Sequence, residues 1–225
     1  MAIEVTTKDT TALSDAEVAE MADLCAAGES GLDVGLVSKQ VEEWVLNTQA
    51  RDGDRLVGFA FVTLERIGGT PAVLVGLASI AAGPAQDQVL AALLAEEYRR
   101  ALLAFPDEDV LLGTRLLRPV GFQVFAGLQD VIPRPDHRAT GEERAWGRRL
   151  AKRFGAEGRI DDRSFVLAGT GSPPPALDLP AGSAAWSPDP ELGSLFAGVD
   201  AARGDCLVAF GWAMAEDLAA GKLPG

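Results

Sequence analysis

Apolar residues occur in several short segments of the chain, and turn residues bound each of them. Residues 45–51 and 55–66 flank Asp52-Gly53-Asp54, a pattern typical of a β-hairpin with glycine at a position of positive φ. Residues 72–81 are almost continuously apolar, which predicts a buried third antiparallel strand. Further strands are predicted at residues 3–5, within 107–117, at 163–168 and at 206–212.

Capping residues and helical periodicity predict helices between these strands. Ser14 with Glu17 forms a capping box, in which each residue bonds a free backbone amide at the start of a helix. That helix is expected to stop near Gly28. Thr140 with Glu143 forms a second capping box. Further helical segments are predicted at residues 37–45, 89–105, 119–128, 192–196 and 213–220.

The stretch from residue 73 to residue 105 is the expected location of any active site. It reads as a buried strand, a loop containing Gly83 and Pro84, and a long amphipathic helix. Either Tyr98 or Glu97 completes the apolar stripe of the helix, and its charged residues are assigned to the solvent side: Glu96, Glu97, Arg99 and Arg100. A strand that leads into a helix N-terminus favours an anionic or carbonyl-bearing ligand.

The 225 residues, 48% of them hydrophobic, are enough for one large core. These elements predict an α/β (α+β) fold, in which a mixed, mostly antiparallel sheet has helices on both faces. We expect one main domain over residues 1–168. Residues 169–225 form a C-terminal extension packed on it, and Gly, Ser and Pro dominate its first part, 169–190. That part is expected to wrap the surface without helix or strand, and its apolar anchors are Leu177, Leu179 and Trp186.

Charge and composition exclude several classes of function. A net charge of −13 argues against nucleic acid as the main partner, although residues 111–168 hold 11 bases against 7 acids. Cys25, Cys206 and a single histidine, His137, do not make an ordinary zinc site, so no metal is expected. Both cysteines are assigned to the core, and a nucleophilic pair with His137 is left open. No apolar run spans a bilayer and no signal peptide is recognised, so a cytoplasmic protein without membrane partner is expected.

The order of elements resembles that of the GNAT superfamily of acyltransferases. The match rests on Asp52-Gly53-Asp54-Arg55-Leu56-Val57-Gly58-Phe59, on the apolar strand 74–80, and on Leu93-Leu94 and Arg99-Arg100-Ala101 in the long helix. It covers about residues 1–135. The resemblance implies transfer of an acyl group from acetyl-CoA, another acyl-CoA or a pantetheine-linked thioester to a small amine or similar nucleophile.

The resemblance also implies a place for the co-substrate. In the family, the strand that here ends near Ala81 splays from its neighbour, and its free backbone groups bind the pantetheine arm. The loop that follows holds the pyrophosphate with backbone amides at the helix N-terminus. The implied cofactor-binding residues are Leu77, Ser79, Ala81, Gly83, Gln86 and Gln88.

The sequence departs from the family pattern at two points. The loop 82–88 has one glycine, a proline that lacks an amide donor, no basic residue, and Asp87, which would repel phosphate. No tyrosine lies at 121–128, where the family often has its catalytic acid. The single tyrosine, Tyr98, is assigned to packing. The catalytic residues are unknown, and the candidates are Ser79, Arg115, which could hold a substrate carboxylate, and Glu65.

Three hypotheses for the function remain. The first is a GNAT-type N-acyltransferase acting on a small molecule. The second is a GNAT-fold protein that has lost ordinary CoA use and binds a small molecule or a protein, or catalyses another reaction in the same cleft. The third is a structural partner in a homodimer joined through residues 169–190. The C-terminal extension, with Trp186 and Trp212, is also a candidate lid over the cleft.

Overall fold

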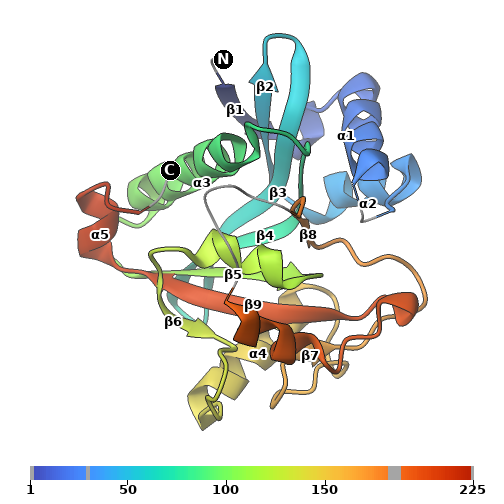
Figure 1. Cartoon of the computed structure of the whole chain (residues 1–225). Coiled ribbons are helices and arrows are strands. Elements are labelled where there is room, and N and C mark those ends of the chain that lie inside the picture. Colours follow the sequence, from blue (N-terminus) through green and yellow to red (C-terminus); the bar gives the residue numbers. More distant parts are fainter. Residues whose placement is uncertain (1–2, 29–30, 182–188, 224–225) are drawn as a thin grey trace.

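The structure is a computed structural model that describes residues 3–28, 31–181 and 189–223. These residues form one mixed sheet with helices on both faces (Figure 1). The strands are β1 (Ile3–Asp9), β2 (Leu46–Asp52), β3 (Arg55–Ile67), β4 (Thr70–Ile80), β5 (Val110–Leu116), β6 (Gln129–Ile132), β7 (Val166–Leu167), β8 (Leu177–Asp178) and β9 (Cys206–Ala213). The helices are α1 (Asp15–Ala27), α2 (Val34–Glu43), α3 (Gln86–Ala104), α4 (Gly141–Arg153) and α5 (Ala215–Ala219), and 3₁₀ turns cover Thr10–Ala12, Pro119–Phe125, Pro190–Phe196 and Ala201–Arg203.

The strand order is β1-β2-β3-β4-β8-β5-β9-β6, and β7 pairs with β9. Neighbouring strands from β1 to β4 run antiparallel, as do β5 and β9, whereas β4 is parallel to β5 and to β8. The β2–β3 hairpin turns at Gly53, whose φ is 58°, as the Asp-Gly-Asp sequence predicts. The prediction of a mixed, mostly antiparallel sheet is therefore confirmed.

Adjacent residues of β2 show how the two faces of the sheet are covered. Asn47 contacts Met21 of α1, and Thr48 bonds Glu97 of α3. Because successive side chains of a strand point to opposite faces, α1 and α3 must lie on opposite sides of the sheet. Figure 1 shows this arrangement, with α3 on one side of β2 and β3 and with α1 and α2 on the other.

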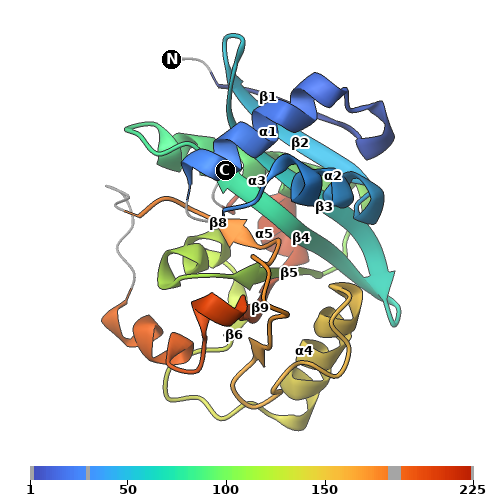
Figure 2. The same ribbon diagram turned by 90° about the vertical axis from the view of Figure 1, so that its right-hand side faces the viewer.

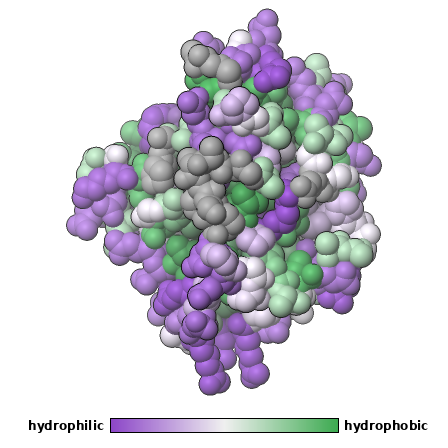
Figure 3. Space-filling model, viewed as in Figure 1, coloured by the Kyte–Doolittle hydropathy of each residue, from purple (hydrophilic) through white to green (hydrophobic). Residues whose placement is uncertain are grey.

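Helix α4 covers the sheet beside β9 and has one apolar and one charged face. Trp146 packs edge-on against Trp212 of β9, with 5.9 Å between ring centroids. Leu150 and Phe154 are also buried, as the periodicity predicts. The end of the molecule that α4 occupies in Figure 1 is strongly hydrophilic in Figure 3. Trp212 is therefore part of this packed layer. The other residue of the proposed lid, Trp186, lies outside the described residues.

Several predicted elements need correction. Strand β1 extends to Asp9, beyond the predicted range 3–5. Helix α2 starts before residue 37 because the Asp33 side chain accepts a hydrogen bond from the Leu36 amide (2.9 Å) and caps it. The strand predicted at 163–168 shrinks to β7 because Phe165, with φ of 61°, interrupts the extended backbone. The prediction of no strand within 169–190 is wrong at β8, which pairs with two strands of the sheet.

The assignment of Glu97 to the solvent side is also wrong. Its side chain lies under β2 and the residue is 2% exposed, whereas Tyr98 is buried as predicted. Glu97 is four residues from both Leu93 and Ala101, which are buried on the same face of α3. Helical geometry therefore places it within the apolar stripe.

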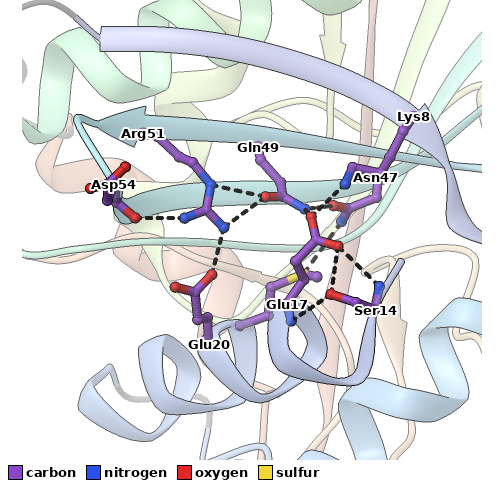
Figure 4. A network of polar contacts seen from close by, with 9 residues as sticks. Lys8, Ser14, Glu17, Glu20, Asn47, Gln49, Arg51 and Asp54 are labelled. Atoms are coloured by element: carbon purple, nitrogen blue, oxygen red, sulfur yellow. Dashed lines mark hydrogen bonds and ion pairs between the residues drawn. The ribbon is translucent and has the colours of Figure 1, made fainter. Parts of the chain in front are cut away.

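A polar network joins α1 to the outer strands (Figure 4). The capping box predicted at the start of α1 is present, because the Ser14 side chain bonds the Glu17 amide and the Glu17 carboxylate bonds the Ser14 amide (3.0 Å). That carboxylate also accepts hydrogen bonds from Lys8 (2.5 Å) and Gln49 (3.1 Å). Burial alone would raise the pKa of Glu17, but the hydrogen bonds from Lys8, Ser14 and Gln49 lower it to about 2.

We expect Glu17→Gln to lower the free energy of unfolding by about 1–2 kcal/mol at pH 7, because a neutral amide keeps the capping box but loses the partly buried charge-assisted bond with Lys8. Since the pKa of Glu17 is lowered on folding to about 2 from 4.5, this stability is present above pH 4.5 and is lost as the pH falls toward 2. Urea unfolding at pH 7 and pH 3 measures both effects. The control is Glu20→Gln, which removes an exposed pair with Arg51 and should cost about 0.5 kcal/mol or less. Equal losses for the two variants would contradict the role given to Glu17.

Candidate functional site

A bulge in β4 opens the centre of the sheet. Ala60 of β3 pairs with Ala78 and Val62 pairs with Val75, so one residue of β3 lies opposite two residues of β4. The parallel pairing of β4 with β5 ends at the same level, at Val75 opposite Thr114. Beyond this point the two strands part, as the resemblance to the GNAT superfamily predicts. The parting strands form the groove that would receive the pantetheine arm of an acyl-CoA.

Strand β8 fills this groove. Leu177 pairs with Ala78 of β4 and also with Leu116 of β5, and Asp178 pairs with Ser79. Figure 2 shows β8 between β4 and β5 at the place where they diverge. The backbone groups of β4 that the groove would offer to a ligand are therefore paired with the protein's own chain.

Side chains on both sides hold β8 in place. Leu177 and Leu179 are buried in the core, which confirms two of the predicted apolar anchors; the third, Trp186, lies outside the described residues. From the end of β5, Arg118 donates hydrogen bonds to the Leu179 carbonyl (2.6 Å) and to the Asp178 carboxylate (3.3 Å). The segment is thus fixed by apolar burial and by charge-assisted bonds.

The residues present do not fit an acyl-CoA. The groove is filled by β8, and in the hollow of about 420 Å³ beside Ala81 and Ala82 the Arg118 guanidinium is already paired with Asp178, so the described lining offers no unpaired positive charge to a pyrophosphate. At the start of α3, Asp87 lies in the first turn and its carboxylate accepts a bond from Gln123 (3.3 Å). The Asp87 carboxylate thus already interacts favourably with the positive end of the α3 helix dipole.

The cofactor-binding residues predicted from the resemblance fall into two groups. Leu77 and Ser79 are fully buried, and the Ser79 hydroxyl has no hydrogen-bond partner among the described residues. The other four lie at or beyond the end of β4, half-buried or exposed: Ala81, Gly83, Gln86 and Gln88. Within the loop, the Gln86 side chain accepts a bond from the Gly83 amide (3.4 Å). These residues border the filled groove and the loop after it.

Two of the three catalytic candidates meet in another pocket. Arg115 and Glu65 line a pocket of about 410 Å³, whereas Ser79 lies beneath β8. The Glu65 carboxylate is held by Arg153 of α4 through two hydrogen bonds, one of 2.6 Å from Nε and a shorter one from Nη2. Glu65 is therefore ion-paired at the pocket and is a poor candidate for a general base.

Arg115 is the most unusual group in this pocket. The residue is 5% exposed, and its guanidinium lies 4.6 Å from the centre of the Phe154 ring. Its Nη2 donates a bond to the Gly76 carbonyl (3.3 Å), whereas its Nε is buried without a partner among the described residues. Burial lowers the pKa of Arg115 to about 10, which leaves it charged at neutral pH.

Other residues of the pocket are not identified by the sequence analysis. Trp44 and Phe154 form an aromatic wall, with ring centroids 6.2 Å apart. Arg159 and Pro175 also line the pocket. An aromatic residue in a helical stripe looks the same whether it packs in a core or lines a pocket, so the sequence holds no signal for these roles.

The two cysteines and the histidine, which the sequence analysis leaves open as a nucleophilic pair, make structural contacts. Cys25 and Cys206 are buried in the core, as predicted, and burial raises the pKa of Cys206 to about 11. His137 bonds Glu143 at 2.8 Å. Among the residues that the structure describes, no group of three or more His, Cys, Asp or Glu could hold a metal. No helix in the described part of the chain is long and apolar enough to cross a membrane.

No protein-family model and no curated protein matches this sequence. Among solved structures, the chain is similar to an aminoglycoside 6'-acetyltransferase of type Ii, with 16% identity over 58% of this chain and 86% of that one and a TM-score of 0.44. It is also similar to the ribosomal-protein-S18-alanine N-acetyltransferase from Escherichia coli, with 12% identity over 62% and 86% of the two chains and a TM-score of 0.42. The strands themselves have the arrangement that the resemblance implies: β1–β4 are antiparallel, a bulged β4 parts from a parallel β5, and α3 follows β4.

Proposed function

We propose that this protein uses a GNAT-like fold to bind a small molecule and has lost ordinary CoA use. The observation that carries the proposal is β8, which occupies the groove between β4 and β5. The loop 82–88, which has no basic residue, and Asp87 in the first turn of α3, near the place where a pyrophosphate would lie, support it. The pocket lined by Arg115 is the site that we assign to the small molecule.

A second candidate is a GNAT-type N-acyltransferase in which β8 leaves the groove when an acyl-CoA binds. One observation favours it: β4 and β5 part at the bulge and are bridged there by a strand of two residues only. Such a short strand could be displaced if the ligand made more bonds than β8 does. The two candidates differ in what happens when β8 is weakened.

Calorimetric titration with acetyl-CoA, and with CoA and pantetheine as comparisons, tests the proposal. We expect no saturable heat from any of the three with the full chain, because the β4 backbone is already paired. Leu177→Ala and Leu177→Asp weaken the hold of β8, and circular dichroism checks that both variants are folded. We expect the same result for them, because the loop 82–88 still has no basic residue and Asp87 still lies in the first turn of α3. Binding of acetyl-CoA by the unmodified protein would contradict the proposal. Binding that appears only in the Leu177 variants would also contradict it and would support the second candidate.

A further inference from the structure

The pocket beside Arg115 has a buried positive charge with no carboxylate partner. Among the described residues Arg115 makes no ion pair, and its hydrogen bond goes to the neutral Gly76 carbonyl (3.3 Å). The Cys206 thiol beside it is neutral, since burial raises the pKa of that thiol. Glu43, which also lines the pocket, acts on Arg115 through its charge but makes no ion pair with it. A buried guanidinium without a direct ion pair is poorly compensated, so an anionic ligand in the pocket would stabilise it.

The other charges of the pocket set how much negative charge it can take. The ionisable residues that line it are three arginines and two glutamates: Arg115, Arg153, Arg159, Glu43 and Glu65. Arg153 is neutralised by Glu65. Arg159 donates bonds to the backbone carbonyls of Ala168 (3.0 Å) and Gly155 (3.3 Å), so it adds a second positive charge to the lining. Glu43, whose charge raises the pKa of Arg115, adds a negative one. The lining therefore carries one net positive charge, which matches a monoanion better than a dianion.

The walls of the pocket suit an apolar ligand body. Trp44 and Phe154 offer aromatic surface, and Leu74 and Pro175 add aliphatic surface. The volume of about 410 Å³ lies within the range of roughly 300–1,000 Å³ typical of small-molecule sites. A planar guanidinium binds a carboxylate with two parallel hydrogen bonds. Among the described residues, the guanidinium of Arg115 donates one hydrogen bond, from Nη2 to the Gly76 carbonyl, so it has further N–H donors to offer.

We infer that this pocket binds a small aromatic carboxylate, whose carboxylate group pairs with Arg115 and whose ring packs against Trp44 and Phe154. This inference rests on the proposed function, because it names the class of small molecule that the protein binds. It assigns Arg115 a binding role and no chemical step. The buried guanidinium is fixed by the Phe154 ring on one side and by Gly76 on another.

Ligand-observed NMR titration with phenylacetate tests the inference. The comparison probes are phenylacetamide, which has the same ring without the charge, and phenyl phosphate, which carries more charge. We expect phenylacetate to bind saturably and at least about tenfold more tightly than either comparison probe. Equal binding of phenylacetate and phenylacetamide would overturn the inference, because the charge would then not matter. Tighter binding of phenyl phosphate would overturn the assignment to carboxylates.

Two arginine variants locate the site. Arg115→Met should weaken phenylacetate binding at least about tenfold and should not lower the melting temperature, because it removes an uncompensated buried charge. Arg148→Met is the control: this exposed arginine pairs with Asp162 and does not line the pocket, so the affinity should change by about twofold or less. Equal affinity of Arg115→Met and unmodified protein would overturn the inference.

These outcomes are distinct from the failure of the proposed function. Acetyl-CoA binding would refute the loss of CoA use whatever the phenylacetate titrations show. Failure of phenylacetate to bind, together with the absence of acetyl-CoA binding, would refute only the assignment of an aromatic carboxylate to this pocket.

Discussion

Glu97→Gln is expected to gain about 3 kcal/mol of stability relative to the unmodified protein as the pH rises from 4.5 to 8. Glu97 is 2% exposed; one carboxylate oxygen accepts a bond from Thr48 (2.5 Å) and the other has no partner among the described residues. Burial raises the pKa of Glu97 from 4.5 to about 7, and the hydrogen bond from Thr48 and the nearby Arg100 offset only part of this effect. A shift of one pKa unit corresponds to ~1.4 kcal/mol.

The direction of the effect follows from proton binding. Because the pKa of Glu97 is higher in the folded protein than in the unfolded chain, the folded protein holds a proton that the unfolded chain has released. The stability of the unmodified protein is therefore fully present below pH 4.5 and is lost as the pH rises through about 7. Glutamine does not titrate, so the variant does not lose this contribution. The constant cost of placing an amide there cancels when the two pH profiles are subtracted.

Urea unfolding of both proteins at several pH values measures this difference. The matched control is Glu96→Gln, one residue earlier. The pKa of Glu96 is lowered, chiefly by its hydrogen bond from Arg99 and also by that from Arg100. Since that group titrates below pH 4.5 in the folded protein, its profile should run parallel to that of the unmodified protein between pH 5 and pH 8. A Glu97→Gln profile that also runs parallel would show that Glu97 is ionised in the folded state.

Local patterns predict most of the sheet and helices because each depends on residues close in sequence. Both capping boxes form as Ser14 and Thr140 predict, and the hairpin turns at Gly53. Strand β9 lies where the apolar run at 206–212 predicts it, between β5 and β6. The polarity of Glu97 predicts a solvent-exposed position, but its spacing of four residues from Leu93 places it on the buried face of α3.

Strand β8 could not be predicted in the same way. It has two residues in a segment rich in proline and glycine, too few to show any alternation. It is a strand only because β4 and β5 part and leave unpaired backbone groups that Leu177 and Asp178 satisfy. Its formation depends on a gap between strands more than 60 residues earlier in the chain, and no local pattern records such a gap.

The candidate site shows the same division between local and distant information. Arg115 was identifiable because it is the one charged residue in the apolar strand β5. The sequence alone leaves open whether Arg115 pairs with a substrate carboxylate or with a surface acid. The structure removes the surface acid, since no carboxylate among the described residues pairs with Arg115. Its aromatic neighbours, Trp44 and Phe154, directly follow α2 and α4 and are far away in the sequence.

Gly76→Ala is expected to lower the free energy of unfolding by about 3 kcal/mol. Gly76 lies in the bulge of β4, and a Cβ atom there would stand 1.9 Å from Cε2 and 2.1 Å from Cζ2 of the Trp44 indole. Trp44 is 8% exposed and its Nε1 donates a bond to Gln40 (3.1 Å), so the indole cannot move without losing packing and a buried hydrogen bond. Overpacking of this kind costs roughly 1–3 kcal/mol, and the lost bond adds about 1 kcal/mol.

A double-mutant cycle tests whether Trp44 is the cause. In a Trp44→Leu background the crowding atoms are gone, so adding Gly76→Ala should cost less than about 1 kcal/mol. Gly141→Ala is the control for glycine replacement, because nothing lies within 4 Å of its Cβ position at the start of α4. It should leave stability unchanged or raise it by up to about 1 kcal/mol. Equal costs of Gly76→Ala in the two backgrounds would mean that Gly76 serves the bulge of β4 itself, and that the Trp44 wall of the Arg115 pocket does not depend on it.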